Sequence, residues 1–303
     1  MHYSYRRLLK YYIKNPIEFY SKMKGFLVLS YLKLIYRFKK SSGIKKVSND
    51  SCAYYYLSER YKNFLDNLPR YKEDNYWENI IWRCRLQWED NAPKLNKSCL
   101  ASIREYAKTK KIVIITNDNI NDYVKFPEYI MEKYNKGIIS KTHFSDILRC
   151  ELLIKYWWTR VDSTVLLTDY NKDFFDTDFF VFKNNDEYIA LSSWFITSNK
   201  NNPILLTTRE LLYEYRRTND YLIHYFLFHL FFTLSTKKYP NIWNKVLKYS
   251  NIPPHVMQHE FLDEFNDKRF TELKNISSIH KLNHKIEREK IKKNSLFAYI
   301  ENL

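Results

Sequence analysis

Between residues 79 and 197, short apolar runs typical of strands alternate with amphipathic stretches typical of helices. The strand-like runs are "NIIWRCRLQW" (79–88), "KIVIITNDN" (111–119), "RVDSTVLL" (160–167), "DFFVFK" (178–183) and "EYIALSSWFIT" (187–197). Helical stretches cover 92–109 and 143–158, and 122–137 is read as a helix or a loop. Strands that alternate with helices form a mostly parallel sheet with helices on its faces. We therefore expect an α/β fold.

The chain carries a net charge of +16, and the charge is concentrated near the N-terminus. Residues 1–48 hold twelve Lys or Arg and one acidic residue, interleaved with apolar and aromatic side chains at helical spacing. Such a basic, amphipathic helical segment suits an anionic membrane surface. The alternative is a helical hairpin packed on the main domain. No recognition motif for nucleic acid accompanies the charge, so we expect no nucleic-acid partner.

The four cysteines show neither metal-binding spacing nor a disulfide framework. No run of about 20 apolar residues is present that could cross a membrane. These features favour a cytoplasmic protein, bound peripherally to the inner face of the cell membrane through residues 1–48. Residues 49–75 are expected to form a helical connector, and residues 286–303 a C-terminal helix or tail.

Polar residues follow the first strand-like runs, in "QWEDN", "TNDN" and "VDST". Ligands bind at the carboxyl ends of strands in open α/β sheets, so these ends could bind a nucleotide, a sugar or a metal ion. Asp146 and Arg149 share one face of the expected helix 143–158. They form either a surface ion pair or a pair that holds ligand hydroxyls and a phosphate. Asp162 comes next, and its carboxylate could hold a hard cation.

Together these segments resemble the bacterial capsular polysaccharide synthesis proteins, which are related to the DxD-type glycosyltransferases of family 32 and have a GT-A fold. The resemblance runs from about Ile80 to Lys285. It is carried by residues 80–103 and 112–156, and by "VDSTVLLT" (161–168), "SSWFITSNKNNPIL" (192–205), "DYLIHYFLFH" (220–229) and "SSIHKLNHK" (277–285). It implies a GT-A-like, Rossmann-type sheet flanked by helices over residues 76–285, preceded by the basic helical extension.

The resemblance also implies a function. The protein would move a sugar from a nucleotide-sugar, usually a UDP-sugar, to a lipid-linked oligosaccharide in capsular or surface polysaccharide synthesis. Asp162 stands in a shortened DxD-like motif, and with His280 it would be catalytic and would hold Mn²⁺ or Mg²⁺. The cation would stabilise the leaving nucleoside diphosphate, with retention of configuration. The donor-binding residues would be Trp82, Thr116, Asp146, Arg149, Thr164, Lys281 and Lys285, and Trp194 would stack an acceptor sugar.

Two stretches depart from the family pattern. The first strand reads "RLQW" where the family tends to have Trp-Trp-Gln-Gly, and the family usually reads Lys-Tyr-Gly-Gly before the motif strand. Trp157 and Trp158 replace both glycines here, and Arg160 stands where an aromatic or aliphatic residue is usual. A bulky residue forced to positive φ costs about 1–2 kcal/mol. Three interpretations follow: a pocket altered for a different donor, a catalytically degenerate homologue that binds polysaccharide or stabilises a complex, or indoles that pack outward.

Overall fold

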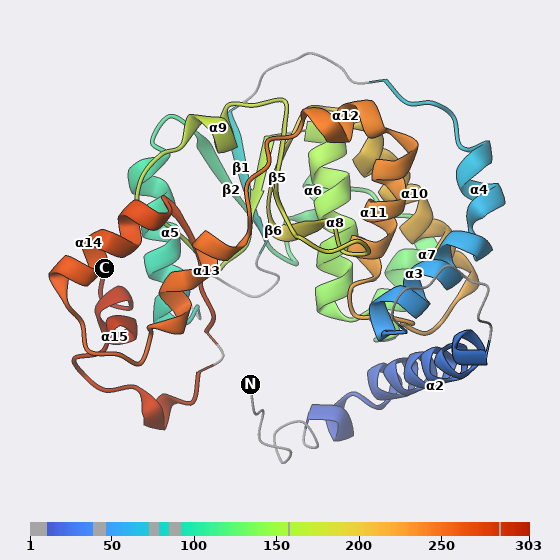
Figure 1. Cartoon of the computed structure of the whole chain (residues 1–303), viewed down its shortest axis with the longest axis horizontal. Coiled ribbons are helices and arrows are strands. Elements are labelled where there is room, and N and C mark those ends of the chain that lie inside the picture. The colour runs from blue at the N-terminus through green and yellow to red at the C-terminus, as the bar shows by residue number, and fades with distance from the viewer. Residues whose placement is uncertain (1–10, 39–46, 73–78, 85–91, 157, 285) are drawn as a thin grey trace.

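The computed structural model describes residues 11–38, 47–72, 79–84, 92–156, 158–284 and 286–303. Its centre is a five-stranded sheet in the order β2-β1-β3-β6-β5 (Figure 1). These strands are β1 (Ile80–Cys84), β2 (Lys111–Ile115), β3 (Trp158–Val161), β5 (Phe179–Lys183) and β6 (Leu191–Ser198). β1 runs parallel to β2 and β3, whereas β6 is antiparallel to both of its neighbours, β3 and β5. All strands except β6 therefore share one direction, which confirms the predicted α/β class with a mostly parallel sheet.

The strand predicted over 160–167 is divided in two. β3 ends at Val161, and residues 162–164 lead into a separate strand, β4 (Val165–Leu167). β4 pairs with β7 (Ile279–Lys281) in an antiparallel two-stranded sheet. The polar residues inside this apolar run thus mark a break between two sheets. The break also brings a C-terminal segment beside the end of β3.

Helices cover both sides of the central sheet (Figure 1). On one side, α8 (Lys141–Tyr156), α10 (Pro203–Thr218) and α11 (Leu227–Lys238) pack together and against the sheet. On the other side, α5 (Lys94–Tyr106) packs on β4 and α13 (Ile252–His259) packs on β7. The other elements are α3 (Asn49–Arg60), α4 (Lys62–Asn67), α6 (Ile120–Tyr123), α7 (Glu128–Asn135), α9 (Lys172–Phe175), α12 (Pro240–Lys245), α14 (Asp267–Ile276), the 3₁₀ helix η2 (Arg288–Lys290) and α15 (Leu296–Ile300).

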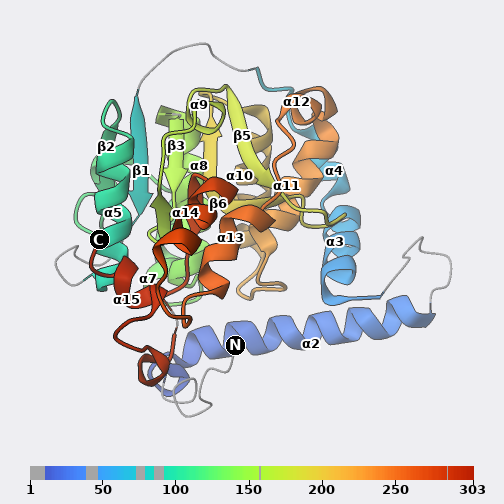
Figure 2. The same cartoon turned by 60° about the vertical axis from the view of Figure 1, so that its left-hand side comes forward.

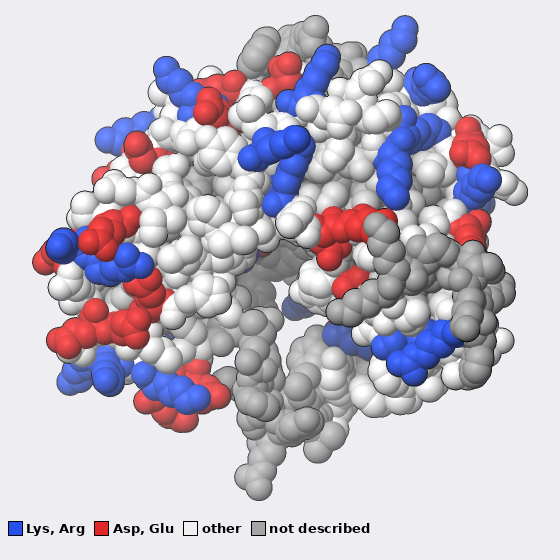
Figure 3. Space-filling view, in the orientation of Figure 1, with Lys and Arg blue, Asp and Glu red and all other residues white. Residues whose placement is uncertain are grey.

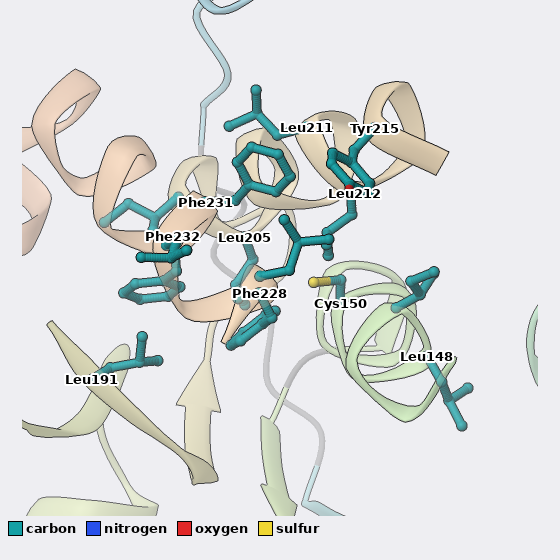
Figure 4. Close-up of a cluster of buried hydrophobic side chains, with 14 of the residues drawn as sticks. Leu148, Cys150, Leu191, Leu205, Leu211, Leu212, Tyr215, Phe228, Phe231 and Phe232 are labelled. Carbon is teal, nitrogen blue, oxygen red and sulfur yellow. The ribbon is translucent and has the colours of Figure 1, made fainter. Parts of the chain in front are cut away.

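The largest apolar core lies where α8, α10 and α11 meet (Figure 4). Phe228, Phe231 and Phe232 of α11 are fully buried beside Leu205 of α10 and Cys150 of α8. Burying each such aromatic side chain contributes about 1.5–3 kcal/mol. This core fixes α8 against the sheet, and α8 carries two of the predicted site residues.

The N-terminal helix α2 (Pro16–Phe38) lies along one edge of the molecule and packs on α3 (Figure 2). Leu29, Leu32 and Tyr36 on its inner face join the main core. Gly25 allows a close approach, because a Cβ atom there would lie 1.7 Å from the carbonyl oxygen of Leu222. No helix within the described ranges is long and apolar enough to cross a membrane. Residues 1–10 and 39–46 of the predicted membrane segment lie outside the described residues.

Gly25→Ala should destabilise the protein by about 1–3 kcal/mol, because the added methyl group meets backbone atoms that cannot rotate away. This loss exceeds the gain in helix propensity, which is at most ~1 kcal/mol. Urea unfolding measures the difference. Ser30→Ala, at an exposed position of the same helix, is the matched control. Equal stability of the two variants would contradict the packing of α2 at Gly25.

Candidate functional site

A cavity of about 1110 Å³ opens at the carboxyl end of β3. Its walls come from the start of α8, the break between β3 and β4, the loop before β6, residues 225–229, and the segments around α13 and after β7. Figure 3 shows a hollow at the centre of this face, between two lobes. Cavities that bind a single drug-sized molecule measure about 300–1,000 Å³. This one therefore has room for a larger ligand, or for two ligands side by side.

Asp162, the first residue after β3, faces three cationic side chains. Arg160 Nη1 donates a hydrogen bond to its Oδ1. Arg149 Nη2 lies 3.9 Å from Oδ1, and Lys281 Nζ lies 3.7 Å from Oδ2. Burial raises the pKa of Asp162, but the charges of Arg160, Lys281 and Arg149 outweigh burial and lower the pKa to about 2. Asp162 therefore stays ionised at neutral pH.

Asp146 and Arg149 both line the cavity from one face of α8, and both are buried. Arg149 Nη1 lies 2.7 Å from Oδ1 of Asp146. Burial raises the pKa of Asp146, and the nearby charge of Arg149 opposes that rise. Nε of Arg149 has no hydrogen-bond partner within the described part of the chain. The pair is thus a buried one inside the cavity, and the alternative of a surface ion pair does not apply.

Arg160 is a cavity residue that the sequence marked only as a departure from the family pattern. Its buried guanidinium donates from Nη2 to Oγ of Ser145 at 3.2 Å and from Nη1 to the carbonyl of Ser193 at 3.4 Å. One signal could have placed it in the site. Residues two apart on a strand point to the same face, so Arg160 could have been expected beside Asp162.

Lys281 and Thr164 meet across β4 and β7. Lys281 Nζ donates to Oγ1 of Thr164 at 2.5 Å, and the carbonyl of Thr164 accepts from the backbone N–H of Leu282 at 2.8 Å. Both residues line the cavity. The structure therefore brings together, in one cavity, most of the predicted site residues: Asp146, Arg149, Asp162, Thr164, Trp194 and Lys281.

His280 does not lie with them. His280 pairs with Leu166 and directly precedes Lys281 on β7. Because successive side chains of a strand point to opposite faces, His280 and Lys281 project from opposite faces of the two-stranded sheet. The ring is 1% exposed, and Nε2 shares a hydrogen bond of 3.2 Å with Oγ1 of Thr168. Burial lowers the pKa of His280 to about 4. The predicted catalytic and metal-binding contact is therefore corrected: His280 packs behind the site, and His284 lines the cavity.

Two residues predicted to line the nucleobase end, Trp82 and Thr116, are not cavity residues. Trp82 on β1 is 1% exposed and packs against Tyr123 and Tyr156. Its ring is therefore closed off from a ligand in the cavity. Lys285 lies outside the described residues, so its contact with the donor stays a prediction.

Trp194 lines the cavity but is held by core packing. Its ring stacks on Phe182 with centroids 4.5 Å apart, and His255 meets its edge at 5.8 Å. Within the described ranges, its Nε1 is a buried donor without a hydrogen-bond partner. The backbone carbonyl of Trp194 accepts from the N–H of Asp162 at 2.8 Å. Trp194 thus fixes Asp162 through its backbone, and its contact with an acceptor sugar stays a prediction.

Trp158 adopts the left-handed conformation that glycine would favour, with φ of 74°. It begins β3, at the opposite end of the strand from Asp162, and it is not a cavity residue. Its ring lies under Lys110, with Nζ 4.3 Å from the ring centroid. The indole of Trp158 therefore does not pack outward as one interpretation expected: it is buried, and it lies away from the cavity. Trp157 lies outside the described residues.

The side chains around Asp162 do not suit a divalent cation. Of the residues with described positions, no three His, Cys, Asp or Glu side chains gather as a metal site. Both oxygens of Asp162 already face positive groups, and Oγ1 of Thr164 is taken by Lys281. A divalent cation at Asp162 would be repelled by these charges. The expected Mn²⁺ or Mg²⁺ therefore does not fit this arrangement.

A family model described as "Capsular polysaccharide synthesis protein" matches residues 33–300. The chain belongs to this family. The matched range contains every cavity residue named above, so the cavity is part of the capsular polysaccharide synthesis domain. A solved structure described as "PaToxG Glycosyltransferase" is similar at 14% identity, with a TM-score of 0.37, over 84% of this chain and 95% of that chain. The search of curated proteins finds no match.

Buried histidines should make this capsular polysaccharide synthesis protein sensitive to acid. Burial lowers the pKa of His229 to about 3 and of His280 to about 4. An unfolded chain protonates histidine near pH ~6.5, so below that pH the unfolded state binds more protons than the folded state. Stability therefore falls as the pH drops, by about 2 kcal/mol for each of these histidines at pH ~5. Asp162 lowers the stability of the folded state further only below pH ~4, where its carboxylate becomes protonated in the unfolded chain but stays ionised in the folded one.

Urea unfolding at several pH values between ~7.5 and ~5 measures this slope. The double variant His229→Gln/His280→Gln should lose stability less steeply with falling pH than the wild type. His259→Gln, at an exposed position, is the control and should keep the wild-type slope. A double variant with the wild-type slope would mean that these rings are protonated in the folded protein.

Proposed function

We propose that this protein is a glycosyltransferase that moves a sugar from a nucleotide-sugar to an oligosaccharide acceptor in capsular polysaccharide synthesis. Family membership supports the pathway. One observation carries the activity: a single cavity combines a buried carboxylate on α8, Asp146, with the cationic groups of Arg149, Arg160 and Lys281. A carboxylate binds sugar hydroxyls, and guanidinium and ammonium groups bind phosphates.

The proposed step follows from this charge distribution. The hydroxyl oxygen of the acceptor bonds to the anomeric carbon, and the bond from that carbon to the diphosphate breaks. The electron pair stays on the diphosphate, and the hydroxyl proton passes to that product. Fixed positive groups near the diphosphate lower the free energy of the transition state. Arg149 lies between Asp146 and Asp162, and this position supports a proposed contact with both the sugar and the phosphate.

The finer identity of the substrates is also a proposal. We propose a UDP-sugar as the donor and a lipid-linked oligosaccharide as the acceptor, as the family resemblance implies. The alternative of a non-catalytic homologue was motivated by the two tryptophans that replace glycines. Trp158 packs at the far end of β3 from Asp162, which weighs against that alternative.

Release of sugar from UDP-sugars and GDP-sugars, with water as a slow acceptor, tests the activity. Arg149→Gln should lower kcat/KM about 100-fold or more, because it removes a charge that meets the transition state. Arg217→Gln, at an exposed ion pair on α10, is the matched control and should behave like the wild type. Folded wild-type protein that turns over no donor would reject the proposed function.

The proposed membrane association is supported by the outer face of α2. This face is defined by exposed apolar side chains that recur every three or four residues, Ile17, Tyr20, Met23, Leu27, Tyr31 and Leu34, with Phe26 exposed next to Leu27. Lys24 and Arg37 are exposed on the same helix. An apolar face flanked by basic residues lies in the headgroup region of an anionic bilayer. Each basic residue adds about 1 kcal/mol of attraction. We therefore propose that the outer face of α2 binds the cytoplasmic leaflet.

Phe26→Glu/Leu27→Glu should lower the membrane partition coefficient at least about tenfold, because it removes two inserted side chains and adds two negative charges. Flotation with vesicles of phosphatidylcholine and phosphatidylglycerol measures the bound fraction. Ile252→Glu, at an exposed apolar position on α13, is the control. A double variant that floats like the wild type would remove α2 as the membrane-binding element.

A further inference from the structure

We infer that Arg160 and Lys281 bind the diphosphate of the donor directly and replace a divalent cation at this site. The inference rests on the proposed glycosyltransferase function and concerns how the same cavity stabilises its leaving group. It follows from three features of the described residues: the charge balance of the cluster around Asp162, the fixed position of Arg160, and donor atoms that the protein leaves unpaired.

The charge balance of the cluster around Asp162 favours an anion. Three cationic groups, on Arg149, Arg160 and Lys281, face two carboxylates, on Asp146 and Asp162. This cluster therefore has at least one excess positive charge. Asp186, the third carboxylate of the cavity lining, is exposed and accepts hydrogen bonds from the backbone N–H groups of Tyr188 and Ile189. His229 and His255 also line the cavity, and burial lowers the pKa of both, so they add no charge at neutral pH. A diphosphate would neutralise this excess, whereas a divalent cation would increase it.

The guanidinium of Arg160 is held in a fixed orientation. It is 4% exposed and is bonded to Asp162, Ser145 and Ser193, which belong to three different parts of the fold. A charge fixed in this way needs no reorganisation when negative charge develops on the leaving diphosphate. Asp162 is the positioning residue in this arrangement, because it orients the cations and does not bind a metal.

The cations approach Asp162 from both sides, with Arg160 and Arg149 at Oδ1 and Lys281 at Oδ2. Such a spread suits a ligand with two adjacent phosphates. Within the described ranges, the buried Nε of Arg149 has no hydrogen-bond partner. Buried donors are normally paired, so this atom indicates that an acceptor from a ligand belongs here. A phosphate oxygen supplies such an acceptor.

Calorimetric binding of UDP, and of inorganic pyrophosphate as a competitor, tests the inference on the full-length protein. The protein is first treated with EDTA. We expect UDP to bind without metal, pyrophosphate to displace it, and added Mn²⁺ to change the Kd less than about threefold. UDP binding that occurs only after Mn²⁺ is added would overturn the inference and leave the proposed transferase function intact.

Charge-removing variants assign the effect to residues. Arg160→Gln and Lys281→Gln should each weaken metal-free UDP binding about tenfold or more, since hydrogen bonds to charged groups are lost. Arg160→Lys keeps the charge and should fall between Arg160→Gln and the wild type. Arg217→Gln is the matched control. If Arg160→Gln does not fold, Lys281→Gln and Arg160→Lys still decide the result.

Two further outcomes are separable. Wild-type affinity in both Lys281→Gln and Arg160→Gln would overturn the inference even if UDP binds without metal. Absence of binding by UDP, GDP and pyrophosphate, together with absence of sugar release with and without Mn²⁺, would overturn the proposed function itself. If the wild-type protein releases sugar from the donor as fast in EDTA as it does with Mn²⁺, this supports the inference independently of the binding data.

Discussion

The carboxylate of Asp162 keeps together positive groups that would otherwise repel one another. Arg149 comes from α8, Arg160 from β3 and Lys281 from β7, and Asp162 lies within 4 Å of all three. Two unit charges 4 Å apart interact by about 4 kcal/mol at an effective dielectric constant of 20. The cluster therefore depends on the break between β3 and β4, because the ionised carboxylate at this break reaches all three elements.

The geometry of β3 explains how the chain accommodates a tryptophan where the family resemblance leads one to expect glycine. Trp158 has φ of 74°, a conformation that costs a non-glycine residue about 1–2 kcal/mol. The buried indole and its contact with Lys110 offset that cost, and Lys110 is itself held 2.5 Å from Asp176. β3 then keeps its register with β6, in which Val161 pairs with Phe195. That register places the N–H of Asp162 on the carbonyl of Trp194.

The sequence predicts those parts of the site that depend on residues close together in the chain, and it misses those that depend on contacts between distant segments. The spacing of Asp146 and Arg149 along one helix was enough to place them on one face, and the polar interruption near Asp162 marked the end of a strand. The choice between His280 and Lys281 depends on which face of β7 meets the cavity, and only pairing with the distant β4 decides that. Likewise, the family resemblance implies a donor contact for Trp82, and no local sequence pattern shows that Tyr123 and Tyr156 cover its ring.

The same burial that makes the fold sensitive to acid also keeps two histidines of the cavity, His229 and His255, neutral at pH 7. It lowers the pKa of each below the ordinary histidine value. Asp162, with a pKa of about 2, is ionised at this pH. The positive field of the cavity therefore comes from arginine and lysine side chains, whose charge does not change between pH ~6 and ~8. An anion held by these groups should change its affinity little over this range, unless it also contacts His284, which lines the cavity at an exposed position.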